Sequence, residues 1–217
     1  MILPNLRQKD GSYLCGAYSV VACIRYFGLE DRKVDVPLFD VNTRCFSDKT
    51  REINTSLEAN ELAASIYKIT GIGLPMTDGQ FVKSDGFSPI FMVAHVLKNF
   101  GFDVVVVCEP GTEAVLGGQY PDEYHRLKSL NIRFELDNAE QFTNQGSLKI
   151  SIILYELPNG TLTGHYVIND EKGLWLDTEL DEHPLHWDKV NDWRISDNKR
   201  QGGHWTGVSL VVSLPNL

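Results

Sequence analysis

The chain has 217 residues, of which 42% are hydrophobic and 23% charged, a composition typical of a globular protein. Its 20 Lys and Arg against 29 Asp and Glu give a formal net charge of −9. That charge argues against nucleic acid or an anionic membrane as the main partner. No apolar run approaches the roughly 20 residues of a membrane span, and the first residues lack the pattern of a signal peptide. We expect a cytoplasmic location, or secretion without a cleaved signal peptide.

Helical patterns dominate the first half of the chain. Apolar residues recur at helical spacing from Cys15 to Phe27, and Gly28 follows as a C-terminal cap. A capping-box pair, Thr55 and Glu58, precedes a second predicted helix over residues 57–70. Ser88 as N-cap predicts a third over 89–100, and a short one is expected over 122–130. Residues 33–50 and 109–120 are expected to be long loops, which in compact domains tend to be functional.

Strand patterns dominate the second half. Strands are predicted over 104–107, 150–155, 163–169, 174–178 and 205–214, with a hairpin turn at 158–160. Helices first and an antiparallel sheet last indicate the α+β class. We expect one domain over 1–217, with a helical half at about 1–145 and a sheet half at about 146–217.

The cysteines predict neither a disulfide framework nor a metal centre. The four of them are irregularly spaced and form no CxxC pair. His183 and His186 flank Pro184, which blocks a regular helix that could present both to zinc. We expect no metal and no cofactor.

Cys15 is the candidate nucleophile. It lies at the predicted start of the first helix, where unpaired N–H groups and the helix dipole favour the thiolate. Gly16 would leave room for a substrate carbonyl near the backbone. The alternative is a small buried cysteine with no chemical role.

His165 and Asp177 are the candidate base and orienting acid. A three-residue turn over 171–173, with Gly173 left-handed, would place Asp177 opposite Val167 and diagonal to His165 on one sheet face. An aspartate there can fix the imidazole tautomer. Asn169 is the alternative orienting residue.

Gln8 is the candidate oxyanion donor, acting together with the Cys15 N–H. Asn5 is the alternative, and an exposed glutamine without a role is the simplest interpretation of this position.

These segments resemble the papain-like cysteine peptidases of the C39-like branch. The resemblance is carried by Gln8, Cys15-Gly16-Ala17, the segment 164–168 and Trp175-Leu176-Asp177, with a similar closing strand over 205–209. It implies a helix-plus-sheet fold and the order Gln–Cys–His–Asp. The spacing from Gln8 to Cys15 is one residue longer than the branch predicts, Tyr18-Ser19 departs from its usual pattern, and residues 30–145 match no part of it.

The resemblance implies a cysteine peptidase acting on a protein or peptide. The same thioester chemistry would serve deamidation of glutamine or asparagine, or acyl transfer to an amine. A papain-like binding module without catalysis is the alternative of a different class.

Overall fold

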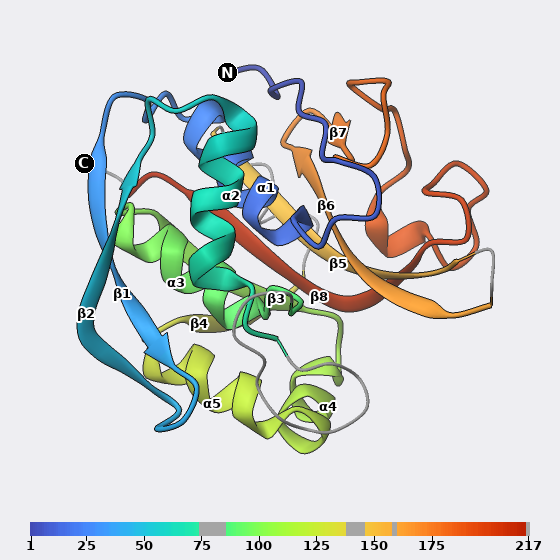
Figure 1. Ribbon diagram of the computed structural model, residues 1–217. Coiled ribbons are helices and arrows are strands. Elements are labelled where there is room, and N and C mark those ends of the chain that lie inside the picture. The colour runs from blue at the N-terminus through green and yellow to red at the C-terminus, as the bar shows by residue number, and fades with distance from the viewer. Residues whose placement is uncertain (74–85, 138–145, 158–159, 216–217) are drawn as a thin grey trace.

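The computed structural model describes residues 1–73, 86–137, 146–157 and 160–215. It combines helices with a two-stranded and a six-stranded sheet (Figure 1). In chain order, the elements are α1 (Cys15–Tyr26), β1 (Lys33–Asp40), β2 (Cys45–Asn54), α2 (Ala59–Thr70), α3 (Ile90–Asn99), β3 (Asp103–Cys108), α4 (Thr112–Gln119), α5 (Pro121–Ser129), β4 (Arg133–Leu136), β5 (Ser147–Glu156), β6 (Leu162–Asp170), β7 (Trp175–Leu176), the 3-10 helix η2 (Val190–Asp192) and β8 (His204–Ser213).

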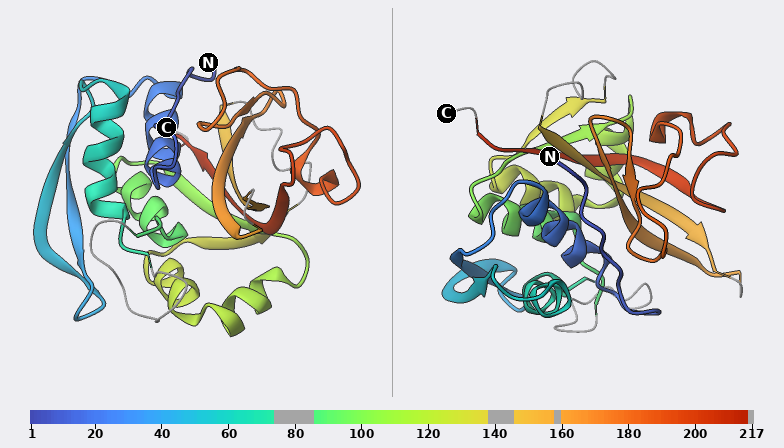
Figure 2. Two further views of the ribbon diagram at one scale, coloured as in Figure 1. Left: turned by 45° about the vertical axis from the view of Figure 1, so that its right-hand side comes forward. Right: turned by 90° about the horizontal axis from the view of Figure 1, so that it is seen from above.

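The larger sheet has the strand order β4-β3-β8-β5-β6-β7. Its pairs are antiparallel except for the parallel pair of β3 and β4. Helices gather on one face of this sheet, and the segment between β7 and β8 covers part of the other face (Figure 2). The arrangement is compatible with the expected α+β class.

Each face of the sheet has its own apolar cluster. The larger cluster joins α1, α2 and α3 to sheet residues such as Ile150 and Leu210. The smaller cluster, on the opposite face, is formed by Ile153, Val167, Trp175, Val190 and Trp193. Because both faces of the sheet are covered by apolar side chains, the central strands have a near-continuous apolar sequence.

Two expected loops are regular elements. Residues 33–50 fall in the antiparallel hairpin of β1 and β2, and residues 109–120 contain α4. In the hairpin, only some inward positions such as Val36 and Ile53 are buried, so its apolar alternation is weak in the sequence. In α4, Leu116 is the buried residue, and the glycines 117 and 118 mask the helical pattern.

Two predicted helix caps are wrong. The Thr55 hydroxyl donates to the Leu29 carbonyl, so it anchors the chain before α2 and does not cap it. The Ser88 hydroxyl bonds Thr70, and Pro89 is the N-cap residue of α3. In both places a tertiary partner outcompetes the local backbone for the hydroxyl.

The predicted strand turns hold where they are described. Leu157 N–H donates to the Thr161 carbonyl at 2.8 Å, which closes the turn from β5 to β6, although residues 158 and 159 lie outside the described residues.

Within the described part of the chain, no helix has the length and apolar character needed to cross a membrane.

Candidate active site

Cys15 is the first residue of α1. Leu14 precedes it as N-cap without a side-chain capping bond, so the first-turn N–H groups face the neighbourhood of the thiol. The residue is partly exposed, whereas Cys23 and Cys108 are buried. Burial raises the pKa of the Cys23 and Cys108 thiols, that of Cys108 to about 11. Cys15 therefore combines access with a helix start, as the sequence predicted.

Gly16 has a packing role that differs from the expected one. A Cβ at this position would lie 2.5 Å from Ser88 Cβ and 3.2 Å from Tyr166 Cε2. The Tyr166 hydroxyl in turn donates to the Ser88 carbonyl at 2.8 Å. Gly16 thus lets α1 approach the segment before α3 and strand β6 closely.

The β6–β7 hairpin brings His165 and Asp177 together. Ile168 pairs with Leu176, Asp170 N–H donates to the Leu174 carbonyl at 3.0 Å, and Gly173 has φ +76°. This is the register that the three-residue turn predicted. His165 Nε2 lies 2.8 Å from Asp177 Oδ1, and both side chains are almost fully buried.

Asn169, the alternative orienting residue, does not contact the imidazole. Its side-chain Nδ2 donates to the Asp170 carbonyl at 3.3 Å. Because Nε2 of His165 is taken by Asp177, Nδ1 is the nitrogen left for the thiol.

The electrostatics of the pair favour a charged imidazole. Burial by itself lowers the pKa of His165, but the hydrogen bonds with Asp177 and with the Cys15 thiol outweigh it and raise that pKa to about 10. Burial likewise favours protonated Asp177, yet the bond and charge of His165 and the charge of Arg200 lower the Asp177 pKa. The site therefore holds an imidazolium against an ionised carboxylate.

Gln8 is buried next to these groups, whereas Asn5 is exposed. Its Oε1 accepts a hydrogen bond from the Thr178 hydroxyl at 2.8 Å, which turns the amide nitrogen toward the site. That nitrogen donates to the Ser12 carbonyl at 3.3 Å and to Glu179 Oε1 at 3.5 Å. Both contacts are long, and long hydrogen bonds are weak.

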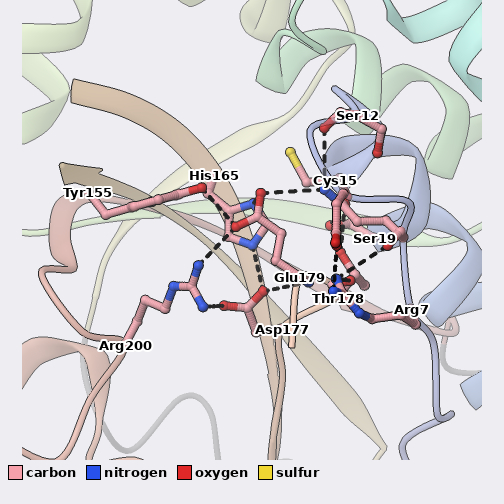
Figure 3. A network of polar contacts seen from close by, with 12 residues as sticks. Arg7, Ser12, Cys15, Ser19, Tyr155, His165, Asp177, Thr178, Glu179 and Arg200 are labelled. Atoms are coloured by element: carbon pink, nitrogen blue, oxygen red, sulfur yellow. Dashed lines mark hydrogen bonds and ion pairs between the residues drawn. The ribbon is translucent and has the colours of Figure 1, made fainter. Parts of the chain in front are cut away.

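Three further residues complete the polar network, and sequence reasoning missed them. Glu179 lies between His165 and Gln8, and Tyr155 and Arg200 both bind it (Figure 3). Glu179 could have been found, because it follows Asp177 by two positions. Arg200 had no such signal, since it comes from an irregular segment before β8.

The same network contains a geometry that a metal could use. One ligand atom each of His165, Asp177 and Glu179 lies within 4.8 Å of the others. However, His165 and Asp177 bond each other, and Arg200 pairs with both carboxylates. These contacts describe an ion-pair network, and we assign no metal to it.

An apolar cavity of about 660 Å³ is lined by the start of α3, by α4 and α5 and by the sheet. Phe87 and Pro89, which flank the Ser88 that contacts Gly16, form one wall, and Val115 and Leu116 of α4 form another. Ile152, Leu154 and Val208 of the sheet form the floor. The 109–120 segment therefore borders this cavity as a helix and not as the expected loop.

A helix-borne thiol beside a buried histidine–aspartate pair is the constellation typical of cysteine peptidases as a class. The comparison with protein families agrees: residues 7–215 match the family described as invasion plasmid antigen J, cysteine protease. The chain belongs to this family of cysteine proteases. Comparisons with curated proteins and with solved structures gave no match.

Proposed function

We propose that the protein is a papain-like cysteine peptidase in which Cys15, His165 and Asp177 form the catalytic triad. The observation that carries this proposal is the buried His165 ring, which is bonded to Asp177 through Nε2 at 2.8 Å and whose pKa is raised by Asp177 and by the Cys15 thiol. The order of these residues along the chain, with Gln8 before them, supports the C39-like branch as the nearest type.

In the proposed reaction, the Cys15 thiolate attacks the carbonyl carbon of the scissile amide. The thiol proton resides on His165 Nδ1, while Asp177 holds Nε2 and stabilises the imidazolium. The tetrahedral oxyanion accepts hydrogen bonds from the Cys15 N–H and from Gln8 Nε2, which exchanges one of its long contacts for the oxyanion.

The tetrahedral intermediate then collapses and expels the amine. The carbon–nitrogen bond breaks, the leaving amine takes the proton from His165, and Cys15 retains the acyl group as a thioester. Water, deprotonated by His165, attacks this thioester and releases the acid. The substrate is a protein or peptide, and the apolar cavity between α3, α4 and the sheet is suited to an apolar part of it.

The test is mass spectrometry of candidate proteins and peptides incubated with the wild-type protein, with Cys15→Ala and with Cys45→Ala. Cys45 is exposed and lies on β2, so its substitution is the matched control. We expect cleavage with the wild type and with Cys45→Ala, and none with Cys15→Ala. Amide-to-acid conversion without cleavage would identify a deamidase instead, and an amine adduct would identify an acyl transferase. Turnover that persists in Cys15→Ala would refute the proposed nucleophile.

A further inference from the structure

Arg200 bridges the two carboxylates of the site. Its Nη1 lies 3.3 Å from Asp177 Oδ2, and its Nη2 lies 2.9 Å from Glu179 Oε2. The guanidinium sits 5.0 Å from the centre of the Tyr155 ring, and its side chain is only 14% exposed. A planar fork with donors in fixed directions is suited to holding two acceptors at once.

The two carboxylate oxygens of Glu179 are held unequally. Its Oε2 accepts hydrogen bonds from the Tyr155 hydroxyl, at 2.8 Å, and from Arg200. Its Oε1 accepts only the long 3.5 Å hydrogen bond from Gln8 Nε2. This oxygen lies 3.8 Å from His165 Nδ1, which is beyond hydrogen-bond distance. Figure 3 shows the carboxylate of Glu179 pulled toward Tyr155 and Arg200, with His165 close beside it.

The position of this weakly held oxygen matters because Nδ1 is the nitrogen that the thiol needs. Asp177 faces the imidazole at Nε2, the Tyr155 ring meets it edge-on at 5.9 Å, and Cys15 and Glu179 remain for the Nδ1 side. A shift of about 1 Å would let Glu179 accept the Nδ1 proton. The imidazolium would then pair with Glu179 and no longer with the thiolate of Cys15.

We propose that Arg200 is a positioning residue that keeps Glu179 off His165 Nδ1 while it holds Asp177 on Nε2. The inference rests on the proposed function, since it assigns Nδ1 to the thiol. Without Arg200, the Glu179 carboxylate competes with Cys15 for the imidazolium and places a negative charge beside the thiolate. Removing Glu179 as well should relieve that competition, which no purely structural role of Arg200 predicts.

The test is a double-mutant cycle on the rate at which iodoacetamide alkylates Cys15 at about pH 7, followed by peptide mass mapping. We expect Arg200→Gln to slow alkylation about tenfold, because the thiol returns to its ordinary reactivity. Arg200→Gln combined with Glu179→Gln should recover at least half of that loss on a logarithmic scale. Arg200→Lys should fall between Arg200→Gln and the wild type, because an ammonium cannot hold both carboxylates.

The exposed pair Arg194 and Glu109 offers a matched cycle with the same charge changes. Arg194→Gln, Glu109→Gln and their combination should all alkylate at the wild-type rate. A double variant at Arg200 and Glu179 that stays as slow as Arg200→Gln, with its fold intact by circular dichroism, overturns the inference. If Arg200→Gln does not fold, the same rescue is required of Arg200→Lys.

Failure of the proposed function gives a different result. In that case the alkylated site near pH 7 is not Cys15, or its labelling is as slow as that of Cys45, in the wild-type protein itself. If Cys15 is reactive but Glu179→Gln does not rescue Arg200→Gln, only the role of Arg200 is refuted.

Discussion

At the residue scale, the site depends on which side chains occupy the two nitrogens of His165. Asp177 takes Nε2 at 2.8 Å, and Glu179 stands 3.8 Å from Nδ1. A difference of about 1 Å thus separates an orienting carboxylate from one that leaves its nitrogen free, since hydrogen bonds weaken steeply with distance and angle. Both carboxylates come from the same segment, so sequence spacing alone does not tell them apart.

We expect Cys15 to be the thiol most sensitive to alkylation near neutral pH. Cys15 is partly exposed and stands at the start of α1, whereas Cys23 and Cys108 are buried. Competitive iodoacetamide labelling of the folded protein measures the order. The exposed Cys45 is the informative competitor, and faster labelling there would mean that the thiolate is not stabilised at Cys15.

Asp177→Asn should lower turnover by roughly 10³- to 10⁴-fold, because an amide no longer stabilises the imidazolium or fixes its tautomer. Asn169→Ala should have a much smaller effect, since Asn169 bonds the backbone of Asp170 and not the ring. Turnover is compared at equal folded fraction, measured by thermal unfolding. The opposite ranking of the two variants would assign the orienting role to Asn169.

At the scale of elements, the position of Cys15 depends on how closely α1 approaches its neighbours. Gly16 is the point of closest approach, since Ser88 and Tyr166 fill the space where a Cβ would stand. The position of Asp177 depends instead on strand register. A shift by one residue in β7 would move Asp177 to the other face of the sheet. Helix α1 is therefore placed by close packing, and the β6–β7 hairpin is placed by strand register.

Gly16→Ala should destabilise the protein by about 1–3 kcal/mol, because the added methyl overlaps Ser88 in a packed region. Gly118→Ala in α4 is the matched control, as nothing lies within 4 Å of its Cβ position. That control should be neutral or stabilising by up to about 1 kcal/mol, since alanine favours a helix. Urea unfolding measures both, and equal effects of the two substitutions would contradict the packing role of Gly16.

At the scale of the whole molecule, the packing of α3 against α5 leaves a carboxyl group in an apolar setting. Glu123 of α5 accepts a hydrogen bond from the Phe91 N–H at 3.1 Å, at the start of α3, and lines the large cavity. Burial raises the pKa of Glu123 to about 7, although the backbone N–H groups of Phe91 and Ile90 oppose the shift. We therefore expect the junction between these helices to be sensitive to pH.

The sign of this effect follows from proton linkage. A carboxyl whose pKa is raised by folding binds its proton more tightly in the folded chain, so the contribution of Glu123 to stability falls as the pH rises from about 4.5 to about 7. Glu123→Gln keeps an acceptor for Phe91 but removes the charge. It should raise the free energy of unfolding at pH 8, relative to its effect at pH 4, by on the order of 2 kcal/mol.

Urea unfolding at the two pH values measures this difference. Asp122→Asn, at the exposed carboxylate that precedes Glu123, is the control and should change the pH dependence much less, because the charge of Asp122 is only a minor cause of the raised pKa of Glu123. If Glu123→Gln shows the same pH dependence as the wild type, then the carboxyl is not shielded from water at this junction.

The sequence by itself determined the parts of this protein that depend on local rules. The start of α1 at Cys15 follows from helical spacing, and the meeting of His165 with Asp177 follows from a three-residue turn that requires a left-handed Gly173. The spacing of apolar residues and the residue types of a turn are properties of neighbouring positions, so a single sequence is sufficient to predict them. The same rules failed for the β1–β2 hairpin, where few positions are buried, and for the hydroxyls of Thr55 and Ser88, which distant partners claimed.

Only the tertiary structure decided which charges surround the imidazole. Arg200 reaches Asp177 and Glu179 from an irregular segment, and Gln8 reaches Glu179 from the other end of the chain. The path of that irregular segment depends on packing of Trp193 against Trp175, and such packing has no periodic signal in the sequence. Contacts between distant segments are decided by how apolar surfaces bury one another, and that outcome belongs to the whole chain.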